Sequence, residues 1–169
     1  RQQVHFSAAA TDPRLRLSDD FVTSLTEDEQ QRIWVINARN NIIDCIDTGN
    51  TIHHFPLTMN GQAFSSELKA ILADHDGKLW VGTKEGGLVR FDPSGGRSRL
   101  FTISDGLLSE TINSLCLDDR NRLWVYTAAG LVWIDSSREA IHQLDNDILR
   151  FGNSADDEPL LFSRNGNIY

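Results

Sequence analysis

Residues 72–83 read Leu72-Ala-Asp-His-Asp-Gly-Lys-Leu-Trp-Val-Gly-Thr83: an apolar segment, a polar turn and a second apolar segment around a tryptophan. Gly77 can adopt the positive φ that a tight hairpin turn requires. Branched and aromatic residues, which are enriched in strands, follow directly after the turn. The stretch therefore predicts two antiparallel strands joined by a short turn.

The same pattern recurs along the chain. Trp34, Trp80 and Trp124 lie 46 and 44 residues apart, and each follows Ile or Leu and precedes Val. An aspartate stands six residues before each tryptophan: Asp28, Asp74 and Asp118. One further step of about 45 residues reaches Tyr169. Self-similarity at a fixed period indicates a repeat architecture.

Each repeat unit predicts four short strands. In the middle unit they are residues 70–74, 79–82, 88–92 and 97–101. Four antiparallel strands in about 45 residues are typical of a propeller blade, whose two faces must be covered by neighbouring blades. The predicted fold is thus all-β: a partial β-propeller of four-stranded antiparallel blades. A sandwich of similar strand count would not explain the period.

The register of the repeat divides the chain into five parts: residues 1–20, 21–67, 68–111, 112–157 and 158–169. The first is expected to hold the end of a preceding blade and a link, the next three are whole blades, and the last holds two strands of a truncated blade. This arithmetic predicts an incomplete ring. Either a small four-bladed ring closes imperfectly, or a larger ring is completed by the remaining blades of the parent protein or by a second copy.

Two stretches resemble the two-component regulator propeller repeat: residues 72–83 with Gly86-Gly-Leu-Val-Arg-Phe-Asp92, and the link Asp105-Gly-Leu-Leu-Ser109. The resemblance extends over nearly the whole chain and is weaker in the first unit, where Glu29-Gln-Gln31 replaces the expected Asp-x-Gly turn. It implies the extracytoplasmic, periplasmic sensor region of a bacterial hybrid two-component or diguanylate cyclase protein. It transfers no catalytic position.

Composition excludes some classes of function. The formal net charge is −8, and the basic residues are scattered, whereas a nucleic-acid surface needs a basic stripe. No stretch approaches the roughly 20 apolar residues of a membrane span, so none is expected in this segment. Cys45 and Cys116 lie in apolar runs at non-equivalent repeat positions, which favours small buried side chains over a disulfide. Whether they are reduced stays open.

The sequence predicts no catalytic residue, no cofactor and no metal site. His53 and His54 should project to opposite faces of a strand, so they cannot both bind one metal ion. Residues 74–77 also resemble the Asp-box hairpin of sialidase-like propellers, in which the aspartate binds local backbone N–H groups. Structural roles are therefore expected for six residues: Trp34, Trp80, Trp124, Asp74, Asp76 and Gly77.

Ligand-binding candidates come from positions that vary between units while the scaffold repeats. In propellers, ligands usually meet the face formed by the turns between strands two and three and by the inter-blade links. The candidates there are Arg39, Lys84, Glu85 and Tyr126. Trp133 stands where the preceding unit has Arg90, and it either stacks on a ligand or packs on a neighbouring blade. A small molecule or an oligosaccharide is the expected ligand.

The leading functional hypothesis is a sensory ligand-binding module without its output domain. One alternative is a protein-interaction platform of the WD-repeat kind, which a large exposed apolar patch would mark. The other is an enzyme similar to the streptogramin lyases, which needs a histidine and an acid at the central channel. No histidine occupies a repeat position expected there, so the chain is not predicted to be an enzyme.

Overall fold

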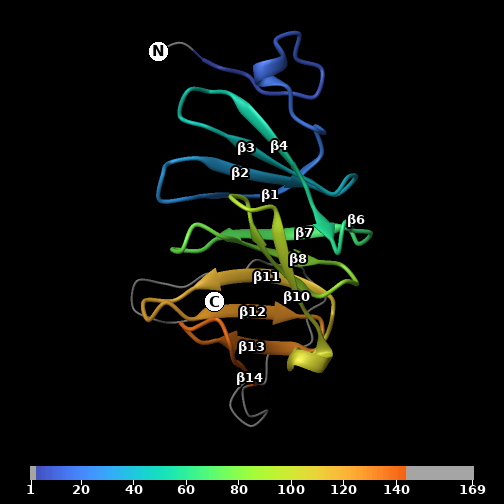
Figure 1. The fold of residues 1–169 in the computed structure, drawn as a ribbon, viewed down its shortest axis with the longest axis vertical. Helices are drawn as coiled ribbons and strands as arrows, with labels where there is room; N and C mark the ends of the chain where they lie inside the picture. The colour runs from blue at the N-terminus through green and yellow to red at the C-terminus, as the bar shows by residue number, and fades with distance from the viewer. Residues whose placement is uncertain (1–2, 144–169) are drawn as a thin grey trace.

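The computed structural model describes residues 3–143 of the chain, so the predicted strands within residues 158–169 lie outside the described part. Three sheets of four antiparallel strands are stacked one on another along the long axis of the molecule (Figure 1). In each sheet, consecutive strands are neighbours. The predicted fold class, a partial β-propeller, is confirmed.

The first blade comprises β1 (Val22–Glu27), β2 (Ile33–Asn37), β3 (Ile42–Ile46) and β4 (Ile52–Pro56). The second comprises β7 (Leu68–Ala73), β8 (Leu79–Thr83), β9 (Leu88–Asp92) and β10 (Arg97–Phe101). The third comprises β11 (Ile112–Leu117), β12 (Leu123–Thr127), β13 (Gly130–Ile134) and β14 (Ile141–Gln143). The remaining elements are the short hairpin β5 (Thr58–Met59) and β6 (Gln62–Ala63) and the 3-10 turns η1 (Pro13–Leu15) and η2 (Ile103–Asp105).

The chain before the first blade forms a compact loop. Residues 4–6 lie in no strand, and an isolated bridge joins Ser7 to Arg16. Ser18 donates from its backbone N–H and its hydroxyl to the buried carboxylate of Asp44 on β3. These contacts tie the loop to the first blade, and the assignment of residues 1–20 to a preceding blade stays a prediction.

The hairpin between the first two strands of each blade is built around the repeated aspartate. Asp28 Oδ1 accepts the backbone N–H groups of Gln30 and Arg32 at 2.9 and 3.0 Å. The left-handed residue of this turn is Gln31, with φ 61°, where the second blade has Gly77 with φ 78°. The first unit therefore makes the same turn without the expected glycine.

The same aspartates hold the tryptophans. The indole Nε1 of Trp34 donates to Asp28 Oδ2 at 2.7 Å, and Trp80 donates to Asp74 Oδ2 at 2.9 Å. Trp124 repeats the bond with the aspartate of its own blade. A buried indole N–H needs a hydrogen-bond partner, which explains the six-residue spacing seen in the sequence.

The core consists of two apolar layers, one between each pair of blades. Trp34 and Ile43 of the first blade pack with Val81 and Val89 of the second. Trp80 in turn lies in the layer that the second blade forms with the third. Each fully buried indole removes roughly 200 Å² from water, a contribution of about 5 kcal/mol before entropic costs. Stacking of the blades is thus what makes each sheet stable.

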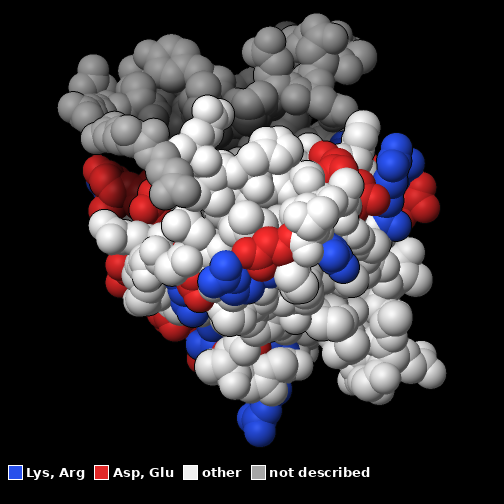
Figure 2. Space-filling model, turned by 90° about the horizontal axis from the view of Figure 1, so that it is seen from above, with Lys and Arg blue, Asp and Glu red and all other residues white. Residues whose placement is uncertain are grey.

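The first strands of the blades lie side by side: β1 against β7, and β7 against β11. The hydroxyls of Ser24 and Thr26 on β1 accept the backbone N–H groups of Ile71 and Ala73 on β7. These bonds fix the first two blades to each other at this edge. On the face that Figure 2 shows, acidic and basic side chains are interspersed.

Candidate functional site

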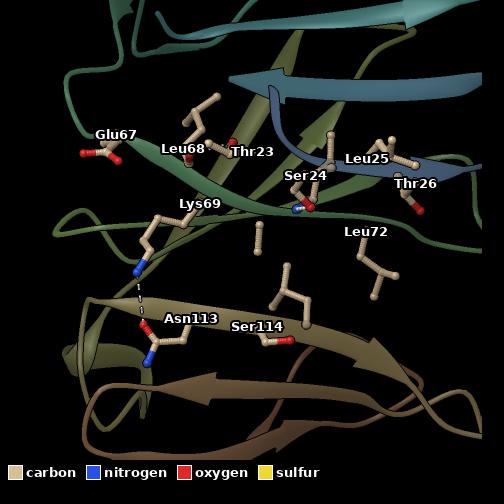
Figure 3. Close-up of a pocket in the computed structure, with 13 residues that line it drawn as sticks. Thr23, Ser24, Leu25, Thr26, Glu67, Leu68, Lys69, Leu72, Asn113 and Ser114 are labelled. Carbon is tan, nitrogen blue, oxygen red and sulfur yellow. Dashed lines mark hydrogen bonds between the residues drawn. The ribbon is translucent and has the colours of Figure 1, made fainter. Parts of the chain in front are cut away.

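A cavity of about 490 Å³ lies between the three first strands (Figure 3). One end is polar, with Glu67 and Lys69 from β7 and its preceding link and Asn113 from β11. The other end is apolar, with Leu25 and Leu72. A cavity of this size with a few polar groups is typical of small-molecule sites.

The polar end opens beside the turn between β8 and β9, because the start of β7 pairs with the end of β8 (Leu68 with Thr83). Lys69 Nζ donates to Asn113 Oδ1 at 3.4 Å, which joins the second and third blades across the cavity. The polar end therefore lies on the face where the sequence placed the ligand.

A second hollow of about 480 Å³ lies beside the first on this face. It is lined by the link before β7 and by the β8–β9 turn, including Ser66, Glu67, Lys84 and Glu85. Lys84 Nζ forms an ion pair with Glu67 Oε2 at 3.4 Å, and the Glu85 N–H donates to Ser66 Oγ at 3.1 Å. Glu67 lines both hollows and connects them.

Buried side chains hold the β8–β9 turn in shape. Thr83, which is fully buried, donates its hydroxyl to the Gly87 carbonyl and accepts the Gly86 N–H. Gly87 has φ 79°, and a Cβ there would meet the carbonyl oxygen of Phe101. The turn presents Lys84 and Glu85 on a fixed backbone.

The structure brings two of the five predicted ligand residues together, Lys84 and Glu85. Arg39 is exposed on the β2–β3 turn, with its guanidinium 5.1 Å from the ring centre of Phe21. Tyr126 is half-buried on β12, and Trp133 on β13 stacks on the His142 ring at 3.9 Å. These three line neither hollow, and the ligand-binding role of all five stays a prediction.

Sequence reasoning missed the residues at the polar end of the cavity. Thr23, Lys69 and Asn113 occupy equivalent positions, each one residue after the start of a first strand. These three residues differ between the blades, while the residue before each of them is apolar in all three. The same kind of variation on a repeated frame identifies Lys84 and Glu85 as candidates.

The opposite end of the blades carries a buried ionic contact. Arg138, 3% exposed in the turn between β13 and β14, donates from Nη2 and Nε to the two carboxylate oxygens of Asp74, both at 2.7 Å. Burial raises the pKa of Asp74, but hydrogen bonds from Arg138 and Trp80 outweigh it, so the pKa lies below its ordinary value. Asp74 therefore links the second blade to the third.

Asp76 and Gly77 lie in the β7–β8 turn, at the same end of the second blade as Asp74. Asp76 pairs with Lys78 at 2.7 Å and with Arg90 at 2.5 Å, at the edge of the β7–β8 turn. Lys78 stands where the other two blades have arginines that bind their own aspartates. In the second blade this bond comes from Arg138 of the neighbouring blade.

Among the described residues, Ser18, His54 and Asp44 lie together but not in the order that a catalytic triad needs. His54 Nδ1 lies 2.7 Å from Asp44 Oδ1, while the Ser18 hydroxyl donates to the same carboxylate and not to the imidazole. A serine nucleophile would need the imidazole as its base. Within residues 3–143, no histidine lines the central cavity, and no group of His, Cys, Asp and Glu could hold a metal ion.

Both cysteines are free thiols. Burial raises the pKa of Cys45 to about 11 and that of Cys116 to about 12. The thiolate is the reactive form, so neither side chain is activated near neutral pH.

The family described as "Two component regulator propeller" matches residues 64–85, from the link before β7 to the β8–β9 turn. Residues 64–85 are similar to a repeat of this family. The resemblance read from the sequence is confirmed by this match, which contains β7, the link before it and part of the β8–β9 turn. No curated protein sequence matches the chain.

Solved propeller structures resemble the chain at low identity. The extracellular domain of BT4673 from B. thetaiotaomicron, named as a one component system, shares 20% identity at a TM-score of 0.70, covering 90% of this chain and 23% of that one. The extracellular domain of the hybrid two component system BT3049 from the same organism shares 17% at 0.63, covering 78% and 19%. Virginiamycin B lyase from Staphylococcus aureus shares 14% at 0.67, covering 89% and 49%.

These likenesses confirm the β-propeller fold. The chain spans less than a quarter of the two extracellular domains, which belong to signalling proteins. Among the described residues, no helix has the length and apolar character that crossing a membrane requires.

Proposed function

We propose that the chain is part of the periplasmic sensor region of a bacterial signalling protein and binds a small molecule or an oligosaccharide on the face of the β8–β9 turn. The observation that carries this proposal is the polar end of the central cavity, which is joined through Glu67 to the hollow beside Lys84 and Glu85. The family match over the same segment supports a sensory context.

The position of the cavity suits a sensor. Its walls come from the first strands of three blades, so a bound ligand contacts all three sheets at once. A ligand shifts a conformational equilibrium only by its differential affinity for the two states. A ligand seated between the first strands favours one packing of the blades, and this packing is the signal passed to the output domain.

The experiment is a thermal-shift screen of the chain against oligosaccharides and small anions, followed by calorimetry of each hit. We expect at least one oligosaccharide to raise the melting temperature, and Glu67→Gln, which removes a carboxylate acceptor that lines both hollows, to weaken its binding at least tenfold. Glu139→Gln, on an exposed turn far from the cavity, serves as the matched control. A screen without hits, or equal affinities for both variants, would contradict the proposal.

Exposed apolar side chains on the first blade favour its contact with a further protein surface. Phe21, Val22 and Leu25 are 56%, 42% and 61% exposed. Leu25 is the repeat equivalent of Ile71, which is 5% exposed and packs in the layer between the first two blades. We propose that an adjoining blade, from the parent protein or from a second copy, covers Leu25. A monomer by light scattering would exclude the second copy.

A further inference from the structure

The contacts between the first strands differ from one pair of blades to the next. Where β1 meets β7, here called the first junction, the hydroxyl of Ser24 accepts the backbone N–H of Ile71 at 3.3 Å (Ser24 in Figure 3). Where β7 meets β11, here called the second junction, the equivalent residues are Ala70 and Leu115. Alanine carries no oxygen, so the second junction lacks the side-chain acceptor of the first.

The N–H group of Leu115 points away from its own sheet. Each first strand has a β-bulge near its start, where the pairing with the second strand skips one residue, and it pairs regularly after the bulge. In a regular antiparallel pair, every second residue directs its N–H to the partner strand. The Asp118 N–H donates to the Arg122 carbonyl across this pair. Two residues earlier Cys116 therefore also faces β12, and Leu115 faces away from it.

This donor lies at the wall of the central cavity, which both Ala70 and Leu115 line. Ala70 is 7% exposed, and its methyl group faces the third blade, because a Cβ placed on Gly82 would contact both that methyl group and Ile112 of β11. Within residues 3–143, no side chain accepts the Leu115 N–H. Backbone N–H groups that are shielded from water nearly always have an acceptor, and a ligand in the cavity can supply this one.

The surroundings of the donor favour a carbonyl oxygen. The side chains of Ala70, Leu72 and Leu115 line this part of the cavity and carry no hydrogen-bonding group. A carbonyl oxygen only accepts, whereas a hydroxyl group also brings a hydrogen that needs an acceptor of its own. Leaving a buried donor unpaired costs free energy. In oligosaccharides, the uncharged group with such an oxygen is the acetamido group, whose methyl end suits apolar neighbours.

We propose that the N–H of Leu115 binds the acetamido carbonyl oxygen of a small oligosaccharide, and that Ala70 determines specificity because its methyl group leaves this donor to the ligand. This inference rests on the proposed function for the existence of the site and adds the chemical class of the ligand. In the second junction the ligand oxygen takes the place that the Ser24 hydroxyl has in the first. A bound ligand therefore joins the second and third blades at their first strands.

The first test needs no ligand and follows amide hydrogen exchange by NMR. We expect the Leu115 amide to exchange at least tenfold faster than the Ile71 amide. Ala70→Ser places a hydroxyl where Ser24 stands in the first junction, so it should slow exchange at Leu115 at least tenfold. Ser24→Ala should accelerate exchange at Ile71 and leave Leu115 unchanged. A Leu115 amide that exchanges as slowly as Ile71 in the native chain overturns the inference.

The second test compares acetylated sugars with unacetylated partners of the same linkage. The chain is titrated by calorimetry with N,N′-diacetylchitobiose against cellobiose and with N-acetyllactosamine against lactose. We expect one acetylated sugar to bind at least tenfold more tightly than its partner. Ala70→Ser, which supplies the acceptor from within the chain, should weaken that binding at least tenfold.

Ala73→Ser is the matched control, because Ala73 lies on the same strand and packs in the layer toward the first blade. It should change neither the exchange of the Leu115 amide nor the affinity for the sugar. Circular dichroism and tryptophan fluorescence establish that each variant is folded. Equal affinities within both pairs of sugars, or equal losses in the Ala70 and Ala73 variants, overturn the inference.

The two proposals fail differently. A ligand without a carbonyl group, whose binding is lost in Glu67→Gln but not in Ala70→Ser, leaves the proposed function standing and overturns the assignment of an acetamido group. A chain that binds neither these sugars nor any compound of the screen contradicts both.

Discussion

At the scale of single residues, the repeated aspartate serves three purposes. Its carboxylate closes the hairpin, accepts the indole N–H of the blade's tryptophan and neutralises an arginine. In the first and third blades this arginine is local, Arg32 or Arg122. In the second it is Arg138 from the next blade, which is far more buried. The sequence shows the aspartate but not which arginine pairs with it.

Asp74→Asn should destabilise the chain more than Asp118→Asn. Removing the carboxylate at Asp74 leaves the guanidinium of Arg138 buried without a counter-charge, which typically costs about 3–5 kcal/mol. The side chain of Arg122, the partner of Asp118, is 29% exposed and stays hydrated, so about 1–2 kcal/mol is expected there. Urea unfolding of both variants measures the difference. Similar losses of unfolding free energy in the two variants would mean that the ion pair between Asp74 and Arg138 adds little stability.

The stability of the chain should fall in acid and not near neutrality. Burial raises the pKa values of Asp28, Asp74 and Asp118, but hydrogen bonds from indole, backbone and guanidinium donors outweigh it, so each lies below its ordinary value of 3.8. The unfolded chain then binds more protons than the folded one, so the stabilisation is complete above the unfolded pKa and disappears as the pH falls through the folded one.

Melting temperatures measured from pH 7 to pH 3 provide the readout. They should be nearly constant down to about pH 5 and drop below about pH 4. Asp74→Asn should show a shallower drop than the native chain. A main loss of stability between pH 7 and pH 6 would contradict the role assigned to the three aspartates.

At the scale of elements, the strands could be predicted because their signals are local. The first strand of the middle unit was expected at 70–74 and is Leu68–Ala73, and the third was expected at 88–92 and is Leu88–Asp92. The bulges could not be predicted in the same way. A bulge is a property of the pairing between two strands, and the residue that it re-aims, such as Lys69, looks like any strand residue in the sequence.

Gly77 and Gly87 have nearly the same positive φ but different surroundings, so substituting each of them compares backbone strain with steric contact. Gly77→Ala, with φ 78° and open space at the Cβ position, should cost about 1–2 kcal/mol for the left-handed conformation alone. Gly87→Ala, with φ 79°, should cost clearly more, because its Cβ would meet the Phe101 carbonyl oxygen. Denaturant unfolding of both variants tests the order, and equal losses would show that the β8–β9 turn can move.

At the scale of the whole molecule, the period of the tryptophans was enough to predict the fold but not the closure of the ring. How the ring closes stays a prediction, because the three blades described within residues 3–143 do not form a closed ring. The candidate site, too, could be predicted only in part, because it depends on how separate blades pack together. Its turn residues Lys84 and Glu85 belong to one blade, whereas the cavity exists only where three blades meet.

Leu25→Ser offers a test of what covers the first blade. In the chain alone, the free energy of unfolding should change by less than about 0.5 kcal/mol, because the side chain is 61% exposed. In the longer parent protein the same substitution should cost about 2–3 kcal/mol, since an adjoining blade would bury the leucine. Ile71→Ser is the control that should destabilise both. Equal small effects of Leu25→Ser in the two proteins would rule out an adjoining blade.

The bond between Asp74 and Arg138 has a mechanical consequence. It fastens the carboxyl end of β7 to the third blade, while at the amino end of the same strand Lys69 donates to Asn113 of that blade at 3.4 Å. The buried ion pair therefore restrains the second and third blades at this end of β7. We expect any relative movement of these two blades to be smallest at this ion pair and larger toward the face with the β8–β9 turn.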